Sequence, residues 1–429
     1  MSIVLELPAI VRVLMVFVVI LIAIRAKLSL GNAFLLGSIS LSVLFGLAPR
    51  LTIDSMVQSI IYPKTLSIAL IVSLILVLSN SMEATGQMTR MLNHFKGLIS
   101  DSRINLVVFP SLIGLLPMPG GAVFSAPMVK DLGKNLQLTG SQLSYINYWF
   151  RHVWEYCWPL YPGILLATIL ADMDFFAFVA YMCPISFMAL LIGYLPLKGN
   201  GQLGRQESKA AEKMSVGPFL KELAPILNVI VVGLSLGILI SIVFPRLNIS
   251  KEIGLNLALC ISIGWVWVAN KLPLKRILVL LKSPQIVQMI YMVLTIIIFK
   301  GILENTQAAK LVSEELIQSK VPLVLITMIL PFLVGMITGY TLAFVGVSLP
   351  ILIPLITASG EITFIFPYMM LMMVTGFLGV LLSPLHLCYI LSNEYFQTTY
   401  RQVYRYLWIS CAGILVAGLA YFALSYWLL

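Results

Sequence analysis

The chain alternates between long apolar segments and short polar ones. Apolar runs of about twenty residues recur along it, and about 20 residues of α-helix are needed to cross the hydrocarbon core of a bilayer. We expect ten such crossings, at residues 3–24, 28–48, 63–83, 143–171, 174–195, 220–244, 253–270, 284–303, 364–392 and 404–427. The pattern therefore predicts an all-α, polytopic membrane protein.

Two further apolar runs, 104–130 and 322–357, are interrupted near their middles. The first is interrupted by PMPGG at 117–121 and the second by TGYT at 338–341. Proline and glycine leave backbone groups without helical partners, and lipid cannot satisfy them. We interpret both runs as re-entrant hairpins. For the second run, two ordinary helices joined by a tight turn also fit the length.

The order of expected elements in residues 1–200 recurs in residues 217–429, with residues 201–216 as a polar cytoplasmic linker. Short matches support a duplication: MEAT at 82–85 corresponds to LENT at 303–306, and PSLIG at 110–114 to PFLVG at 331–335. Each half would cross the membrane an odd number of times, so the second half would be inverted relative to the first. Such inverted repeats are common in secondary transporters.

Composition and charge agree with a membrane protein. The chain is 60% hydrophobic and 10% charged, with a mean hydropathy of +1.01, whereas soluble proteins carry about 25% charged residues. The net charge of +10 does not indicate nucleic-acid binding here, because basic residues gather in cytoplasmic loops of membrane proteins. With both termini outside, the cytoplasmic segments hold eighteen of the 27 Lys and Arg residues and the outer segments six. We therefore expect an N-out, C-out orientation.

The most unusual stretch is NYWFRHVWEYCWPLYPG at 147–163, which places Arg151, His152 and Glu155 inside an apolar run. A charged side chain at the bilayer centre costs a few kcal/mol or more, so such residues usually face a protein interior or a cavity. The functional interpretation is that Arg151 contacts an anionic substrate while His152 or Glu155 changes protonation. The alternative is structural, because Arg151 and Glu155 are spaced i,i+4 and could pair on one helix face.

Further candidate binding residues lie at the hairpin tips and at a second helix break. They are Pro119, Gly120 and Gly121 in the first tip, Thr338, Gly339 and Thr341 in the second, and Ser383 and His386 at the break. Free carbonyls and hydroxyls suit Na⁺, and helix N-termini suit a carboxylate. The alternative is ordinary proline kinks and glycine packing.

Enzyme signatures are absent from the sequence. It has three histidines and no phosphate-binding loop, and its five cysteines lie in apolar runs without the spacing of a metal site. We therefore expect no catalytic residue, no metal ligand and no cofactor.

The segment GLLPMPGGAVFSAPMV at 114–129, together with 147–163, resembles a family of prokaryotic membrane proteins, domain of unknown function 401. That family is grouped with the ion transporter superfamily, whose members carry citrate, gluconate, C4-dicarboxylates, lactate or arsenite, or exchange Na⁺ for H⁺. The resemblance implies a scaffold built from the early helices of each half. It also implies a transport domain of hairpins and broken helices that moves as an elevator, usually within a homodimer.

Together these features predict a secondary active transporter of a small organic anion, of the carboxylate class, in the cytoplasmic (inner) membrane of a prokaryote. H⁺ or Na⁺ would be the coupling ion. A Na⁺/H⁺ antiporter, in which Glu155 alternates between the two ions, is the second hypothesis. A binding or assembly protein without transport activity is the third. The expected partners are a small anion or cation, the lipid bilayer and a second copy of the chain.

Overall fold

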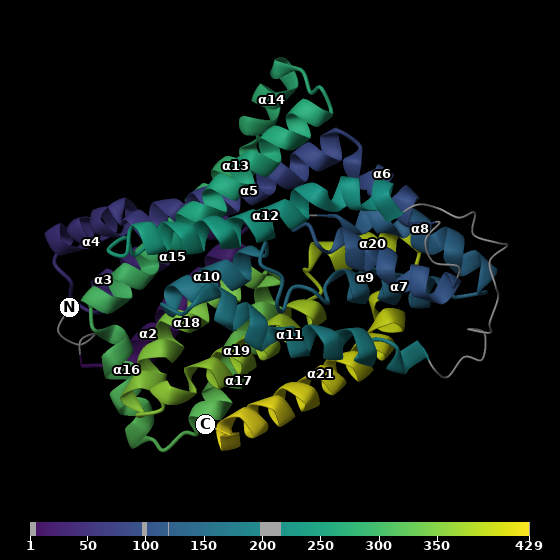
Figure 1. Cartoon of the computed structure of the whole chain (residues 1–429). Helices are drawn as coiled ribbons and strands as arrows, with labels where there is room; N and C mark the ends of the chain where they lie inside the picture. Colours follow the sequence, from purple (N-terminus) through teal and green to yellow (C-terminus); the bar gives the residue numbers. More distant parts are fainter. Residues whose placement is uncertain (1–5, 97–100, 119, 198–215, 429) are drawn as a thin grey trace.

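The computed structural model describes residues 6–96, 101–118, 120–197 and 216–428, and this part of the chain is helical without a β-strand (Figure 1). Most of the expected linker 201–216 lies outside the described residues, as does Pro119. The helices up to residue 197 are α2 Ala9–Arg25, α3 Leu30–Leu44, α4 Pro49–Ile61, α5 Pro63–Ala84, α6 Gln87–Lys96, α7 Ser102–Ile113, α8 Ala122–Asn135, α9 Gly140–Arg151, α10 Pro162–Leu170, α11 Phe175–Ile192 and the short η1 Leu195–Leu197.

The remaining helices lie between residues 216 and 428. They are α12 Val216–Val243, α13 Ser250–Ala269, α14 Leu274–Leu281, α15 Pro284–Asn305, α16 Ala308–Gln318, α17 Leu323–Thr338, α18 Thr341–Ala358, the short η2 Ile362–Phe364, α19 Ile365–Leu382, α20 Leu387–Tyr395 and α21 Tyr400–Leu428. The helices α5 and α15 both span 22 residues and begin with proline at the first helical position. A proline there loses no helical hydrogen bond.

Eight helical segments are long and apolar enough to cross a membrane, within the described residues and by length and composition. The chain is therefore a multi-pass membrane protein, but the ten expected crossings do not all appear as such helices. The run 28–48 gives a helix of only 15 residues, because Gly46 takes a φ of +70° just beyond its end. The run 3–24 gives a helix of 17 residues that begins after Pro8. The run 143–171 is divided into α9 and α10. In the run 322–357, expected to form a hairpin, α18 has 18 residues and is long enough to span.

Two groups of helices pack within the molecule. In the first, which we call the early-helix group, α12 packs on α13, α13 on α5, α5 on α15, α15 on α3 and α3 on α2. The second, the hairpin group, contains α7 to α11 and α17 to α21, with α17 against α19, α7 against α8 and α9, and α19 against α21. Figure 1 shows α5, α12 and α13 along one side, α17 and α21 along the opposite side, and α10 between them.

The two groups differ in how deeply their helices are buried. In the most apolar 18-residue window of residues 362–395, 89% of the residues are buried. In the corresponding window of α12, Val216–Val243, only 22% are buried. Exposed apolar side chains such as Ile242 on α12 and Leu191 on α11 therefore have lipid as their natural environment. The helix α19 instead forms the centre of the hairpin group, where it positions the second break.

Candidate functional site

The first helix break lies between α9 and α10. A capping box formed by Thr139 and Gln142 begins α9, and its last residue is Arg151. The side chain of Asn147 anchors this helix by donating to the Ala122 carbonyl at 3.0 Å and to Ser392 Oγ at 2.9 Å. Turns then occupy the chain until Pro162 begins α10. Arg151, His152 and Glu155 therefore lie at the end of a firmly held helix and in the turn that follows it.

The second break and the two hairpin tips meet the first break. The helix α19 ends before Ser383, whose Oγ accepts a hydrogen bond from Leu385 N at 3.2 Å. Gly339 ends α17 with a φ of +65°, and a Cβ there would lie 3.0 Å from His386 N. A Cβ on Gly163 would lie 2.6 Å from the methyl group of Thr341. The second tip thus contacts both breaks at close range.

A cavity of about 160 Å³ lies where these four irregular segments meet. Its lining includes Met118 and Gly120 from the first tip and Tyr340 and Thr341 from the second. The two breaks contribute Arg151, His152, Glu155, Tyr161, His386 and Cys388. Apart from Met289 of α15, the lining comes from the hairpin group. Residues separated by more than 200 positions in the sequence therefore share one small site.

Arg151 brings a positive charge to this cavity. Its side chain is 2% exposed, and Nη2 donates to the Met118 carbonyl at 2.8 Å. Its Nε has no hydrogen-bond partner, and in the described part of the chain the guanidinium forms no ion pair. The pairing considered for Arg151 and Glu155 is not formed, because α9 ends at Arg151 and the helical i,i+4 spacing no longer applies. A buried guanidinium with a free donor can bind an anion.

Space for Arg151 depends on glycines of the first hairpin. A Cβ on Gly121 would lie 2.2 Å from Arg151 Nη2, and a Cβ on Gly114 would lie 2.1 Å from the Arg151 carbonyl oxygen. Tyr161 fixes the same region by donating to the Gly114 carbonyl at 2.6 Å. At Gly114 the contact is with the backbone, so this position requires glycine, whereas at Gly121 a Cβ would displace the end of the Arg151 side chain. The GLLPMPGG segment therefore shapes the position of the arginine.

His152 and Glu155 connect the first break to the second half of the chain. His152 Nδ1 lies 2.6 Å from the Tyr148 carbonyl, and its Nε2 lies 3.1 Å from His386 Nε2 and 3.6 Å from Glu155 Oε1. The other carboxylate oxygen of Glu155 accepts a hydrogen bond from Thr341 Oγ1 at 3.3 Å. The buried carboxyl group thus contacts a histidine and a hydroxyl group, and not the arginine.

The candidates from the sequence divide into two sets. Those that line the cavity are Arg151, His152, Glu155, Gly120, Gly339, Thr341 and His386. Gly121 lies behind Arg151 instead. The Thr338 hydroxyl donates to the Val334 carbonyl at 2.8 Å, and Ser383 shapes the turn before His386, so neither faces the cavity. Pro119 lies outside the described residues.

A sequence model of one protein family matches residues 8–426 of the chain. The family is described as "Protein of unknown function (DUF401)". The chain belongs to this family. The expected family membership is therefore confirmed, while the assignment to the ion transporter superfamily stays a prediction. A comparison with curated proteins gives no match.

Among solved structures, the fold of this DUF401 protein is similar to that of the YdaH transporter from Alcanivorax borkumensis. The TM-score is 0.57 at 14% sequence identity, and the similarity covers 87% of this chain and 89% of the other. At this identity the likeness establishes a shared fold only. It extends over most of the length of both chains.

Sequence reasoning missed several residues that line the cavity. Met118 supplies the carbonyl that accepts the hydrogen bond from Arg151, and Met289 of α15 also lines the cavity. Cys388 lies beside His386. These side chains look like ordinary apolar residues in a membrane helix. The signal that could have identified Cys388 is the spacing His386-Leu387-Cys388 directly after a helix break.

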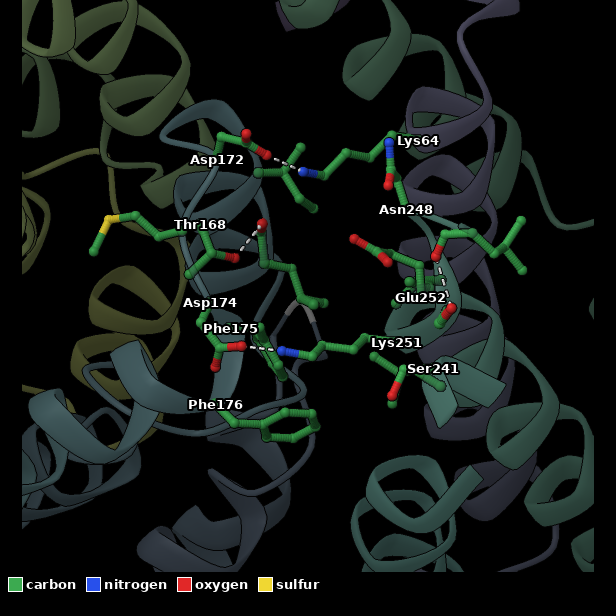
Figure 2. A pocket seen from close by; sticks show the side chains of 17 residues that line it. Lys64, Thr168, Asp172, Asp174, Phe175, Phe176, Ser241, Asn248, Lys251 and Glu252 are labelled. Carbon is green, nitrogen blue, oxygen red and sulfur yellow. Dashed lines mark hydrogen bonds and ion pairs between the residues drawn. The ribbon is translucent and has the colours of Figure 1, made fainter. Parts of the chain in front are cut away.

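A second pocket lies between the two helix groups and has a volume of about 320 Å³ (Figure 2). Here Lys64 Nζ of α5 lies 2.5 Å from Asp172 Oδ1, and Lys251 of α13 pairs with Asp174. Both aspartates belong to the loop between α10 and α11. We call this region the lysine pocket. The Lys64 ammonium, through its hydrogen bond and its charge, holds the pKa of Asp172 below its usual value.

Proposed function

We propose that this protein is a secondary active transporter of a small organic anion of the carboxylate class, coupled to H⁺ or Na⁺. The observation that carries the proposal is Arg151, a buried guanidinium with an unused donor and no carboxylate partner among the described residues, at a cavity between two hairpin tips and two helix breaks. An uncompensated buried charge is costly. An anionic ligand would supply the missing partner.

The size of the cavity favours a small ligand. Its volume of about 160 Å³ corresponds to roughly five water molecules at about 30 Å³ each. A carboxylate with a short carbon chain fits this space, whereas a peptide or a nucleotide does not. The shared fold with a solved transporter supports the transport function.

The arrangement of helices suggests how transport would proceed. The cavity is built almost wholly from the hairpin group, which contacts the early-helix group through α10 against α5 and α18 against α15. Movement of the hairpin group across the early-helix group would carry the site from one side of the membrane to the other. This elevator motion, the inverted relation of the two halves, the homodimer and the N-out, C-out orientation in a prokaryotic inner membrane are parts of the proposal.

The test is transport by the purified protein in liposomes that contain a pH-sensitive dye. Carboxylates of increasing size are added outside in turn, with and without a step in external Na⁺. The proposal expects saturable uptake of one or a few small carboxylates, with proton movement only when the carboxylate is present if H⁺ is coupled. If no carboxylate enters above the rate of protein-free liposomes, the proposal is wrong.

A Na⁺/H⁺ antiporter is the second candidate, and the contacts of Glu155 favour it. This carboxyl group is 9% exposed, lies in the cavity and has no Lys or Arg ion pair in the described part of the chain. A carboxylate beside the hydroxyl of Thr341 could alternate between H⁺ and Na⁺. The antiporter predicts proton movement on a Na⁺ step with no organic substrate, so the same liposomes distinguish the two hypotheses.

A further inference from the structure

Three side chains that commonly bind metal ions meet at the edge of the central cavity. His152, His386 and Cys388 each place one possible ligand atom within 4.8 Å of those of the other two. Two of these atoms, the Nε2 atoms of the histidines, are 3.1 Å apart. We propose that these three residues bind a d-block metal ion of the Zn²⁺ type.

The separation of the two histidines fits a shared metal ion. Zinc binds imidazole nitrogen at about 2.0–2.1 Å in tetrahedral geometry, which places two nitrogen ligands roughly 3.3 Å apart. The observed 3.1 Å between the Nε2 atoms lies close to this value. A simple hydrogen bond between the two rings would give a similar distance. The two interpretations differ in whether the sulfur atom of Cys388 binds the metal ion, and the experiment below measures this.

The hydrogen bond at the far side of His152 prepares its Nε2 to accept a metal ion. A carbonyl oxygen can only accept a hydrogen bond, so His152 Nδ1 donates to the Tyr148 carbonyl, 2.6 Å away. In the neutral ring, Nε2 then carries a lone pair that points toward His386. A hydrogen bond of this kind from the other ring nitrogen is typical of metal-binding histidines, because it fixes the tautomer and the ring orientation.

Cys388 lies at the start of the same helix as His386. His386 is the N-cap of α20, a helix of nine residues, and Cys388 lies in its first turn. Cys388 is buried and belongs to no disulfide. Two ligands thus come from the start of α20, and the third is the C-cap residue of α9.

The set of donors indicates the class of metal. Two imidazole nitrogens and one thiolate suit Zn²⁺ or Co²⁺ and exclude the hard ions Mg²⁺ and Ca²⁺, which prefer oxygen. Three protein ligands leave a fourth position open, as in catalytic zinc sites. Glu155 Oε1, 3.6 Å from His152 Nε2, could occupy that position. Water or a small anion in the cavity could also occupy it.

The experiment is a Co²⁺ titration of the full-length protein, purified in detergent after treatment with a chelator. Cobalt bound to a thiolate gives a near-ultraviolet charge-transfer band that imidazole ligands alone do not give. We expect about one Co²⁺ per chain, the charge-transfer band, and displacement of Co²⁺ by Zn²⁺. Cys388→Ser should abolish the band and weaken binding at least tenfold, and His386→Gln should weaken binding to a similar extent.

Cys411→Ser is the matched control, because Cys411 is also a buried free cysteine but does not line the cavity. It should retain the band and the affinity. Zn²⁺ should also raise the unfolding temperature of the wild type, a readout that requires no variant. The proposal is overturned if the wild type shows no stoichiometric binding, or if Cys388→Ser binds Co²⁺ with an unchanged band.

The metal site does not depend on the proposed transport function. The titration is carried out without any organic anion, whereas the liposome assay is carried out with a chelator present. Uptake of carboxylate without metal binding would refute the metal site alone. Metal binding without uptake of any carboxylate would refute the proposed function alone.

Discussion

The central cavity and the lysine pocket differ in whether their basic side chains have carboxylate partners. In the cavity, the buried Arg151 has a free Nε and no carboxylate partner in the part of the chain that the structure describes. In the lysine pocket, Lys64 and Lys251 each pair with an aspartate, and Asp172 is 86% exposed. Both regions lie beside α10, yet the two aspartates of the lysine pocket have lysine partners, whereas Arg151 has no carboxylate partner among the described residues.

The difference indicates different roles for the two regions. An uncompensated buried charge costs several kcal/mol, so its retention at a cavity is typical of a binding site. An exposed ion pair contributes only about 0–1 kcal/mol. Pairs of that strength between the early-helix group and the α10–α11 loop can break and form again as two bodies move. In the proposed transport cycle, the cavity would bind the ligand and the lysine pocket would be a contact between the two moving helix groups.

The largest effect is expected from Arg151→Gln, which removes the charge that the proposed anion would meet. Removal of one partner of a buried charge pair costs about 2–5 kcal/mol, so uptake at low carboxylate concentration should fall at least about 30-fold. Arg151→Lys should restore only part of it, because lysine lacks the planar guanidinium. The measurement is the initial rate of radiolabelled carboxylate uptake in liposomes.

Arg12→Gln is the matched control for this prediction. Arg12 is also a buried arginine, but it lies on α2, where its guanidinium stacks 4.2 Å from the Phe45 ring centroid. Its substitution should leave the carboxylate affinity unchanged. Equal affinity losses in the two variants would mean that Arg151 acts through stability and not through the ligand.

The sequence indicated which charged residues would be buried, but not how these residues contact one another. Arg151, His152 and Glu155 stood out because polar residues are costly in an apolar run. Their contacts could not be predicted, because α9 ends at Arg151 and so separates the arginine from Glu155. The histidine pair joins residues 234 positions apart. No local pattern indicates such a contact.

The helices of the fold could be predicted from the distribution of apolar residues along the chain. Long apolar runs give helices, and proline or glycine within them gives interruptions, which lie between α7 and α8, α9 and α10, α17 and α18, and α19 and α20. The re-entrant course of the two hairpins and the inverted repeat stay predictions. Helix ends were less predictable. The apolar run 28–48 is longer than α3, because hydrophobicity alone does not reveal that Gly46 adopts a positive φ.

The next largest effect concerns Glu155→Gln. Glutamine keeps an oxygen that can accept the hydrogen bond from Thr341, but it cannot hold a proton or balance a bound Na⁺. An imposed H⁺ or Na⁺ gradient should no longer drive carboxylate accumulation, while exchange of the anion down its own gradient continues. The measurement compares gradient-driven uptake with anion exchange in the same liposomes.

Glu304→Gln is the control for Glu155, because Glu304 has a 60% exposed side chain and lies 3.7 Å from Lys300 Nζ on the same helix. This variant should keep gradient-driven uptake. If Glu155→Gln also keeps it in full, Glu155 is not the site of ion coupling.

A smaller effect is expected from Gly121→Ala, which changes no charge. The added Cβ would lie 2.2 Å from Arg151 Nη2, so the guanidinium must move away from the anion. The backbone at Gly121 has a φ of −56°, which alanine adopts without strain. We expect the carboxylate KM to rise about tenfold, equivalent to about 1.4 kcal/mol, with little change in thermal stability.

Gly264→Ala is the control, because a Cβ there meets nothing within 4 Å. A KM unchanged in both variants would contradict the steric role.

The smallest effect is expected at the lysine pocket, from Asp172→Asn. The pKa of Asp172 is lowered by Lys64 in the folded protein, so the ion pair is intact at neutral pH and is lost as the pH falls through that lowered pKa. Because the pair is exposed and contributes about 0–1 kcal/mol, Asp172→Asn should change the maximal uptake rate by less than about fivefold and leave KM unchanged.

The double variant Lys64→Asp with Asp172→Lys should restore the wild-type rate. Uptake by wild type and variants, measured from neutral to acidic pH and at low and high salt, tests this. A large rise in KM would place the lysine pocket on the binding path and remove the distinction between the two regions.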